Sequence, residues 1–158
     1  MLSSRARYAT RALLDLSMRQ DKGPTLIQDI ADRQNIPLKY LQQILVSLKL
    51  GGFVSSRKGP GGGYSLARAA EKITLGSVLR AMDGPLAPIS CVSVSAYSEC
   101  GCPDPDKCAL RHSFGQVREA MAQLLDNTTF AELRDRQREA NAGRLKLDIV
   151  PDPLDLVA

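Results

Sequence analysis

Apolar side chains recur every three or four positions along most of the first 50 residues, a period that predicts helices separated by short turns. In Ser4–Arg19 the apolar residues form one stripe and the arginines stand opposite. Thr25 and Gln28 have the spacing of a capping box, which would open a second, short helix. Pro37 suits the first position of a third helix that ends near residue 50, where its missing N–H costs nothing. One face of this third helix is apolar throughout, at Leu38, Leu41, Ile44, Leu45 and Leu48.

The opposite face of the third helix carries Lys39, Gln42 and Gln43, residue types that reach phosphates and base edges in DNA. A solvated helix face would have the same composition. The next segment favours DNA binding, because a strand at 53–57, a glycine-rich turn at 58–63 and a return strand at 64–66 predict a β-hairpin. A hairpin directly after the second helix of a helix-turn-helix is the wing of a winged helix. The turn lacks the Lys-Ser/Thr of a P-loop, so a nucleotide site is not favoured.

Three more helices are predicted after the hairpin. A short one spans 72–82, and a loop rich in Pro, Gly and Ser follows at 86–107. A longer helix at 109–125 has apolar residues at steps of 4, 3, 4 and 3, a heptad-like stripe suited to a partner helix, with a contact inside the chain as the alternative. This stripe consists of Leu110, Phe114, Val117, Met121 and Leu124. Thr129 and Glu132 form a capping box for a last, charged helix to about residue 142, and we expect the tail at 143–158 to be disordered.

Composition is that of a globular protein: the chain has 158 residues, 44% of them hydrophobic, and no apolar run near the roughly 20 residues of a transmembrane helix. The N-terminus lacks the apolar segment of a signal peptide, so we expect a cytoplasmic protein with reduced thiols. The net charge is +4, but residues 1–68 carry 11 basic against 4 acidic residues, and residues 69–158 carry 10 against 13. The N-terminal half therefore has the charge to bind a polyanion such as DNA.

All four cysteines lie in one loop, at Cys91, Cys100, Cys102 and Cys108. Soft thiolate ligands at this density indicate a metal or iron–sulfur site. An iron–sulfur cluster, a tetrahedral zinc ion and a redox-switched disulfide are all compatible with four thiols. The sequence lacks the two Cys-x-x-Cys pairs of the usual zinc signature, which favours the cluster. No nucleophile motif, HExxH motif or set of paired carboxylates supports an enzyme.

Three motifs, taken in their order along the chain, resemble those of one protein family. Residues 36–41 read Ile-Pro-Leu-Lys-Tyr-Leu, residues 59–68 read Gly-Pro-Gly-Gly-Gly-Tyr-Ser-Leu-Ala-Arg, and Asp83-Gly84 precedes the cysteines. Over about residues 4–132 the chain closely resembles the Rrf2 family of bacterial repressors, which includes IscR-, NsrR- and RirA-like proteins. The resemblance implies a homodimeric winged-helix transcription regulator that carries an iron–sulfur cluster and senses iron, cluster supply, nitric oxide or redox state.

The resemblance also implies a set of cluster ligands. Cys91 matches the family's first cysteine, and Cys102 and Cys108, with five residues between them, match the last two. The gap after Cys91 is longer than in the family, so Cys100 competes with Cys102 for the second position. In the IscR-like branch the fourth ligand is a His three positions after the last cysteine, whereas His112 follows at four, a rotation of about 100° on a helix. In the NsrR-like branch an Asp near the partner's N-terminus serves, and this chain has an arginine there. We therefore expect Cys100 as the fourth ligand, and a four-iron rather than a two-iron cluster.

The expected fold is mainly α-helical: a winged helix-turn-helix with a two-stranded β wing and a long C-terminal dimerisation helix. We expect a DNA-binding domain at 1–84, a cluster loop at 85–108, and a dimerisation helix with a terminal helix at 109–142. The homodimer would bind a palindromic operator and be switched by its cluster. The predicted DNA-contacting residues are Arg5, Arg7, Lys39, Tyr40, Gln42, Gln43, Arg57, Lys58 and Gly59. A zinc- or thiol-based regulator of the same fold and a small cluster carrier are the alternatives.

Overall fold

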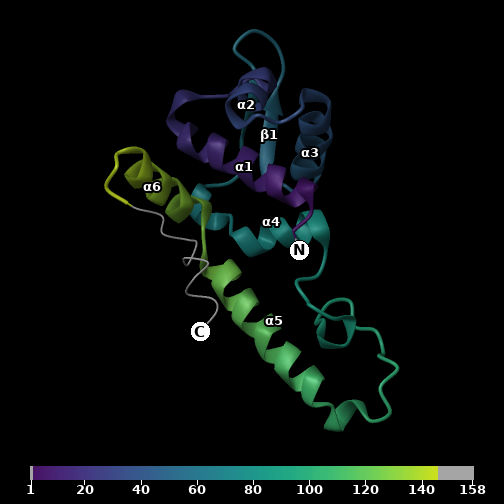
Figure 1. The fold of residues 1–158 in the computed structure, drawn as a ribbon. Helices are drawn as coiled ribbons and strands as arrows, with labels where there is room; N and C mark the ends of the chain where they lie inside the picture. Colours follow the sequence, from purple (N-terminus) through teal and green to yellow (C-terminus); the bar gives the residue numbers. More distant parts are fainter. Residues whose placement is uncertain (1, 146–158) are drawn as a thin grey trace.

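The N-terminal half of the chain folds as three helices followed by a hairpin (Figure 1). The computed structural model describes residues 2–145. The three helices are α1 (Ser4–Met18), α2 (Ile27–Gln34) and α3 (Leu38–Leu50). Strands β1 (Val54–Arg57) and β2 (Gly63–Leu66) form the antiparallel hairpin, with Val54 opposite Leu66 and Arg57 opposite Gly63. The expected winged helix-turn-helix is confirmed.

The C-terminal half contains three further α-helices within the described residues. Helix α4 (Leu75–Asp83) leads into the cysteine loop, which contains two single turns of 3-10 helix, Ser90–Val92 and Pro105–Lys107. Helix α5 (Ala109–Asn127) leaves this loop, and α6 (Phe130–Asn141) follows after a two-residue break. None of the described helices is both long and apolar enough to cross a membrane. Residues 146–158, where the sequence predicts a disordered tail, lie outside the described residues.

Of the two predicted capping boxes, the structure confirms the cap at Thr129 and does not contain the one at Thr25. Thr129 caps α6, because its hydroxyl accepts a hydrogen bond from the backbone N–H of Glu132 at 3.2 Å. The predicted capping box of Thr25 does not form. The backbone of Thr25 instead pairs with that of Tyr64 in β2, with two N–H···O bonds of 2.8 Å, and Leu26 precedes α2 without a side-chain cap. The hairpin therefore takes the residue that the local pattern assigns to the helix, because two backbone hydrogen bonds replace a single side-chain cap.

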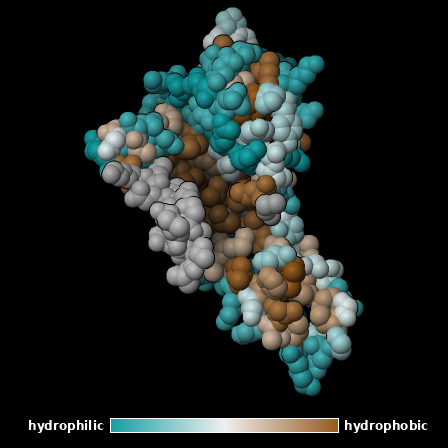
Figure 2. Space-filling view, viewed as in Figure 1, coloured by the Kyte–Doolittle hydropathy of each residue, from teal (hydrophilic) through white to brown (hydrophobic). Residues whose placement is uncertain are grey.

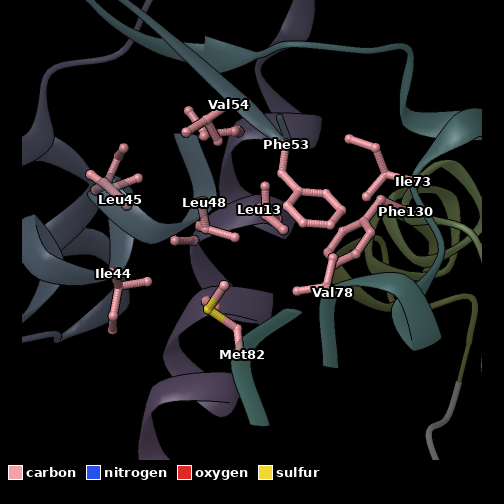
Figure 3. Close-up of a cluster of buried hydrophobic side chains, with 14 of the residues drawn as sticks. Leu13, Ile44, Leu45, Leu48, Phe53, Val54, Ile73, Val78, Met82 and Phe130 are labelled. Carbon is pink, nitrogen blue, oxygen red and sulfur yellow. The ribbon is translucent and has the colours of Figure 1, made fainter. Parts of the chain in front are cut away.

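One hydrophobic core joins α1–α4, the base of the hairpin and the start of α6 (Figure 3). Helix α1 runs through its middle and buries alanines on successive turns, which lets the neighbouring helices approach closely. Leu13 of α1, Leu48 of α3 and Phe130 of α6 are fully buried and are drawn together in Figure 3. The core therefore sits directly behind the helix-turn-helix and holds its helices in place.

Helices α5 and α6 play different structural parts, although the sequence groups them in one C-terminal unit at 109–142. Phe130 and Ala131 are buried in the N-terminal core, and α6 packs against α1. Helix α5 has no buried residue and projects away from the winged domain toward the cysteine loop (Figure 1). Helix α6 is charged along most of its length, and it is anchored at its start by the buried Phe130 and Ala131 and by the partly buried Leu133.

Candidate DNA-binding surface and cysteine loop

The second helix of the helix-turn-helix, α3, separates its two faces cleanly. Leu41, Ile44, Leu45 and Leu48 are buried in the core. Lys39, Gln42 and Gln43 are exposed on the opposite side. The three polar residues that the sequence predicts to contact DNA are therefore free to do so, on the helix that enters the major groove in helix-turn-helix proteins.

Hydrogen bonds join the exposed face of α3 to its two neighbours. Arg5 of α1 donates from Nη2 to the Ser47 hydroxyl at 2.8 Å, and Lys49 donates from Nζ to the Ser56 hydroxyl in β1 at 2.7 Å. The start of α1, the exposed face of α3 and the first strand of the wing consequently form one continuous surface. Arg7 is exposed on the same helix as Arg5, with its guanidinium carbon 5.4 Å from the Tyr8 ring centroid.

Tyr40 has a packing role that its prediction as a DNA contact did not include. Its ring meets that of Tyr8 edge-on, with the ring centroids 5.8 Å apart, and the side chain is half-buried. Arg11 lies on the same Tyr8 ring, 5.7 Å from its centroid. Edge-to-face aromatic pairs and cation–π contacts each contribute roughly 0.5–1 kcal/mol or more. The Tyr8–Tyr40 pair therefore fixes α3 against α1 near the start of the recognition helix.

The wing carries its three predicted contact residues at the tip, and all are exposed: Arg57, Lys58 and Gly59. Gly59 has φ +92°, a conformation that favours glycine in this turn. At Gly63 a Cβ would lie 2.4 Å from the backbone oxygen of Thr25, so only glycine allows the wing to pair this closely with the segment before α2. The wing is thus held along β2 by Thr25, and its turn is open to solvent.

Arg68 anchors the base of the wing, a role that sequence reasoning missed. It donates to the backbone carbonyls of Gly52 at 2.8 Å and Gly51 at 3.0 Å, and its guanidinium carbon lies 4.9 Å from the Phe53 ring centroid. The two carbonyls follow directly after α3, next to the end of the helix, where backbone carbonyls lack partners within the helix. The family motif that ends in Leu-Ala-Arg was the available signal, since it contains this arginine.

A buried ion pair fixes the angle between the first two helices. Asp15 of α1 is almost fully buried, and both of its oxygens accept from Arg33 of α2, at 2.9 and 2.7 Å. Gln34 adds a third hydrogen bond at 3.3 Å. The hydrogen bonds that Arg33 donates to Asp15 raise the pKa of Arg33 above its usual value. The carboxylate is therefore compensated, as buried charges must be.

The four cysteines lie in the loop between α4 and α5, and all four are free thiols. Cys91 is buried in the 3-10 turn Ser90–Val92, Cys100 is half-buried and Cys102 is exposed. Cys108 precedes the first residue of α5 and caps it, because its sulfur accepts the backbone N–H of Arg111 at 3.4 Å. The first and last cysteines are therefore held by structured elements, and the middle two belong to the loop.

The thiols are neighbours, as their pKa values reflect. Burial and a hydrogen bond with Cys100 raise the pKa of Cys91. Backbone and thiol hydrogen bonds from Cys102 lower the pKa of Cys100. The pKa of Cys102 is raised to about 11 by its hydrogen bond to Cys100 and by the charge on that sulfur, with a smaller contribution from Cys108. Cys91, Cys100 and Cys102 are therefore neighbours, and Cys100 interacts with both of the others.

The thiols have not converged on a single point. Within residues 2–145, no set of three or more His, Cys, Asp or Glu side chains stands close enough together to hold a metal ion. A pocket of about 590 Å³ opens beside the loop, and Cys91, Cys108, Arg111 and His112 are among its lining residues. Cys100 and Cys102 do not line it. His112 is exposed on the first turn of α5.

The apolar stripe of α5 is open to solvent. Its members are exposed by 68% at Leu110, 37% at Phe114, 47% at Val117, 40% at Met121 and 70% at Leu124. Apolar colour gathers on the part of the surface where α5 runs (Figure 2). The alternative of an intramolecular core contact is therefore wrong within the described residues, and the stripe remains available to a partner.

Nearly the whole described chain matches one protein family. A family model with the description "Rrf2: Iron-dependent Transcriptional regulator" matches residues 2–136. The chain belongs to the Rrf2 family. It is therefore a DNA-binding transcription regulator and not an enzyme.

Individual Rrf2 relatives agree with this assignment. The HTH-type transcriptional regulator IscR of Erwinia tasmaniensis is 36% identical over 136 residues, which are 86% of this chain and 79% of the relative. A putative rrf2-like regulator of Rhodobacter capsulatus is 36% identical over 137 residues, 84% of this chain and 91% of the relative. Among solved structures, the global cysteine regulator CymR of B. subtilis superposes with a TM-score of 0.73 at 29% identity, covering 85% of this chain and 96% of CymR. IscR of T. potens gives a TM-score of 0.70 at 25% identity, covering 92% of each chain.

Proposed function

We propose that this Rrf2 protein is a homodimeric repressor, acting on DNA in the cytoplasm, whose operator binding is switched by an iron–sulfur cluster in the cysteine loop. The observation that carries the proposal is the position of the four neighbouring thiols. They connect the end of α4, which belongs to the DNA-binding core, to the first turn of α5, which carries the open apolar stripe. A change at the thiols therefore acts between the DNA-binding domain of each protomer and the helix through which the two protomers pair.

The donor set suits a soft metal centre, because four free thiols lie in one loop and two pairs of them, Cys91 with Cys100 and Cys100 with Cys102, already interact. Cys91, Cys102 and Cys108 would hold the cluster, with Cys100 as the fourth ligand. When bound, the cluster supplies a group that is sensitive to iron supply, oxidants and nitric oxide. The thiols are not gathered at one point in the described residues, and metal binding commonly orders the segment that supplies its ligands.

Two of the proposed ligands link the loop to the rest of the protein. The sulfur of Cys108 caps α5 through the N–H of Arg111, so a sulfur engaged elsewhere would leave the first turn of α5 less well capped. Cys91 is buried in the 3-10 turn against which α5 packs. Cluster binding would change both contacts and loss of the cluster would restore them, which would shift the dimer from one geometry toward another.

Metal analysis of anaerobically purified protein tests the cluster. We expect an absorbing, coloured protein that contains iron and sulfide, and we expect Cys91→Ala and Cys108→Ala to lose both. Cys100→Ala and Cys102→Ala form a matched pair, and loss of iron in both supports an all-cysteine site. A colourless, zinc-loaded protein would refute the cluster, as would full iron retention in Cys108→Ala. A disulfide in the isolated protein, detected by thiol counting, would support the thiol switch instead.

Salt-dependent binding to duplex DNA tests the regulator. Operators are selected from a random duplex pool with the loaded and the cluster-free protein. We expect Lys39→Ala to lower the slope of log affinity against log salt by about one, because it removes one phosphate contact. Arg136→Met on α6, outside the proposed surface, should leave the slope unchanged. Affinity that does not respond to salt, or no binding by either form, would contradict the proposal.

A further inference from the structure

Helix α5 meets the winged domain at a single joint near its C-terminal end. There it packs on α4, whereas its other end packs on the 3-10 turn that holds Cys91. Between these attachments α5 is at most half-buried, at Gly115, Arg118 and Ala122. The contact of α5 with α4 is therefore the one that ties the direction of α5 to the DNA-binding domain.

A bidentate ion pair between an arginine and an aspartate forms the centre of this joint. Arg80 of α4 donates from Nη1 to Oδ1 of Asp126 at 2.6 Å and from Nη2 to Oδ2 at 2.8 Å. The two residues are 46 positions apart in the sequence. The hydrogen bonds and the charge of Arg80 lower the pKa of Asp126, and those of Asp126 raise the pKa of Arg80. Two parallel bonds fix direction as well as distance, which a single contact between point charges does not do.

Gly76 makes room for the carboxylate. It lies inside α4 with an ordinary helical backbone, so the chain conformation does not require glycine there. A Cβ at this position would stand 2.1 Å from Oδ1 of Asp126 and 3.1 Å from Nη1 of Arg80. Glycine inside a helix destabilises it relative to alanine. The structure gives this glycine one evident purpose, which is to seat the Asp126–Arg80 pair against the backbone of α4.

Backbone pairing holds the segment after Asp126 in register with the segment before α4. The N–H of Leu75 donates to the Thr128 carbonyl at 2.8 Å, and the N–H of Phe130 donates to the Ile73 carbonyl at 2.9 Å. Phe130 is itself buried in the core. The end of α5 is thus fixed in position, and the ion pair is left to fix its direction.

We propose that Arg80 and Asp126, seated on Gly76, are positioning residues that set the direction of α5 and so determine the spacing between the two operator half-sites. This inference rests on the proposed dimeric, DNA-binding function. Val117, in the middle of the apolar stripe, lies nine residues from Asp126, or about 13 Å along the helix. A tilt of about 15° at the joint would displace it by roughly 3.5 Å, which is close to one base-pair step.

The test is selection of paired half-sites with randomised spacers by the full-length protein in its holo form. We expect the wild type to enrich one spacing. Arg80→Met, Asp126→Asn and Gly76→Ala should each reduce the preference for that spacing over its neighbours about fivefold or more. Affinity for a single half-site should stay unchanged, since the recognition helix is not altered. The double variant Arg80→Met/Asp126→Asn should match the singles, because the pair acts as one unit.

Two variants make the test specific. Gly76→Ala keeps both charges and favours the helix, and its urea midpoint, measured alongside, separates a changed spacing from poor folding. Arg136→Met removes an exposed Arg–Glu pair of 2.6 Å within α6 alone, and it should keep the wild-type spacing. Wild-type spacing in Gly76→Ala and Asp126→Asn would overturn the positioning role and leave the proposed function standing. A wild-type protein that enriches no paired half-sites would overturn both.

Discussion

A single charge in the apolar stripe of α5 should separate the two copies of the chain. We expect Val117→Glu to convert a dimer into a monomer, and the exposed surface of the stripe gives the magnitude. Its five side chains are 37–70% exposed, together about two and a half side chains of apolar surface. Burying a whole side chain of this kind stabilises by roughly 1.5–3 kcal/mol, so two copies would gain about 8–16 kcal/mol on pairing. Association costs about 4–15 kcal/mol, which leaves a dimer with little surplus.

The substitution removes part of this gain and adds a penalty. Val117 is 47% exposed, so the lost burial amounts to about 1.5–3 kcal/mol over two copies. Two carboxylates brought into an apolar contact cost several kcal/mol more. Since each 1.4 kcal/mol changes an equilibrium tenfold, we expect the dimer dissociation constant to rise by about two orders of magnitude or more.

Sedimentation equilibrium over a range of protein concentrations measures this constant. Gln123→Glu is the matched control, because it places the same charge on an exposed position of α5 on the side away from the stripe. Its effect should be a few tenths of a kcal/mol, from repulsion with Glu119 one turn away. An unchanged dissociation constant in Val117→Glu, or an equal rise in both variants, would refute the role of the stripe in pairing.

Three further predictions concern the core and the helix joints. Leu48→Ala should lower the free energy of unfolding by about 3 kcal/mol, whereas Leu50→Ala in the same helix should change it by less than about 0.5 kcal/mol, because Leu48 is fully buried and Leu50 is 85% exposed; urea titration distinguishes them. Asp15→Asn should destabilise by about 2–3 kcal/mol in the same assay, since it leaves a partly buried guanidinium without its charge partner, and an unchanged urea midpoint would contradict this. Asp126→Asn should cost at most about 1 kcal/mol at neutral pH, because the ion pair is more than a third exposed. The pKa of Asp126 is lowered in the folded protein. The difference in the free energy of unfolding between wild type and Asp126→Asn should therefore be present above the usual Asp pKa and vanish as the pH falls through the lowered value. A difference that persists in acid would exclude the ion pair as its source.

Sequence reasoning succeeded where one local period determines the structure. The 3.6-residue pattern of α3 and the alternation of strand, glycine turn and strand predict the winged helix-turn-helix, and the structure confirms it. The exposed stripe of α5 follows from the same kind of pattern. The prediction from sequence failed at Thr25, where a local helix cap competes with backbone pairing to a strand 39 residues later. The spacing of neighbouring residues does not reveal such a distant partner.

The residues that join the parts of the molecule were the hardest to find from the sequence. Phe130 opens a helix that is otherwise charged, so its period gives no sign that one end is anchored in the core. Arg80 and Asp126 stand on two unremarkable helix faces, and their pairing depends on how α4 and α5 cross. Gly76 reads as a weak point in a helix until the carboxylate beside it is seen. Surfaces that touch DNA repeat familiar residue types at regular spacing, whereas the joints that would transmit a signal from the cysteine loop are unique contacts between distant residues. They become visible only in three dimensions, and changing them tests the coupling without touching either the DNA-binding residues or the thiols.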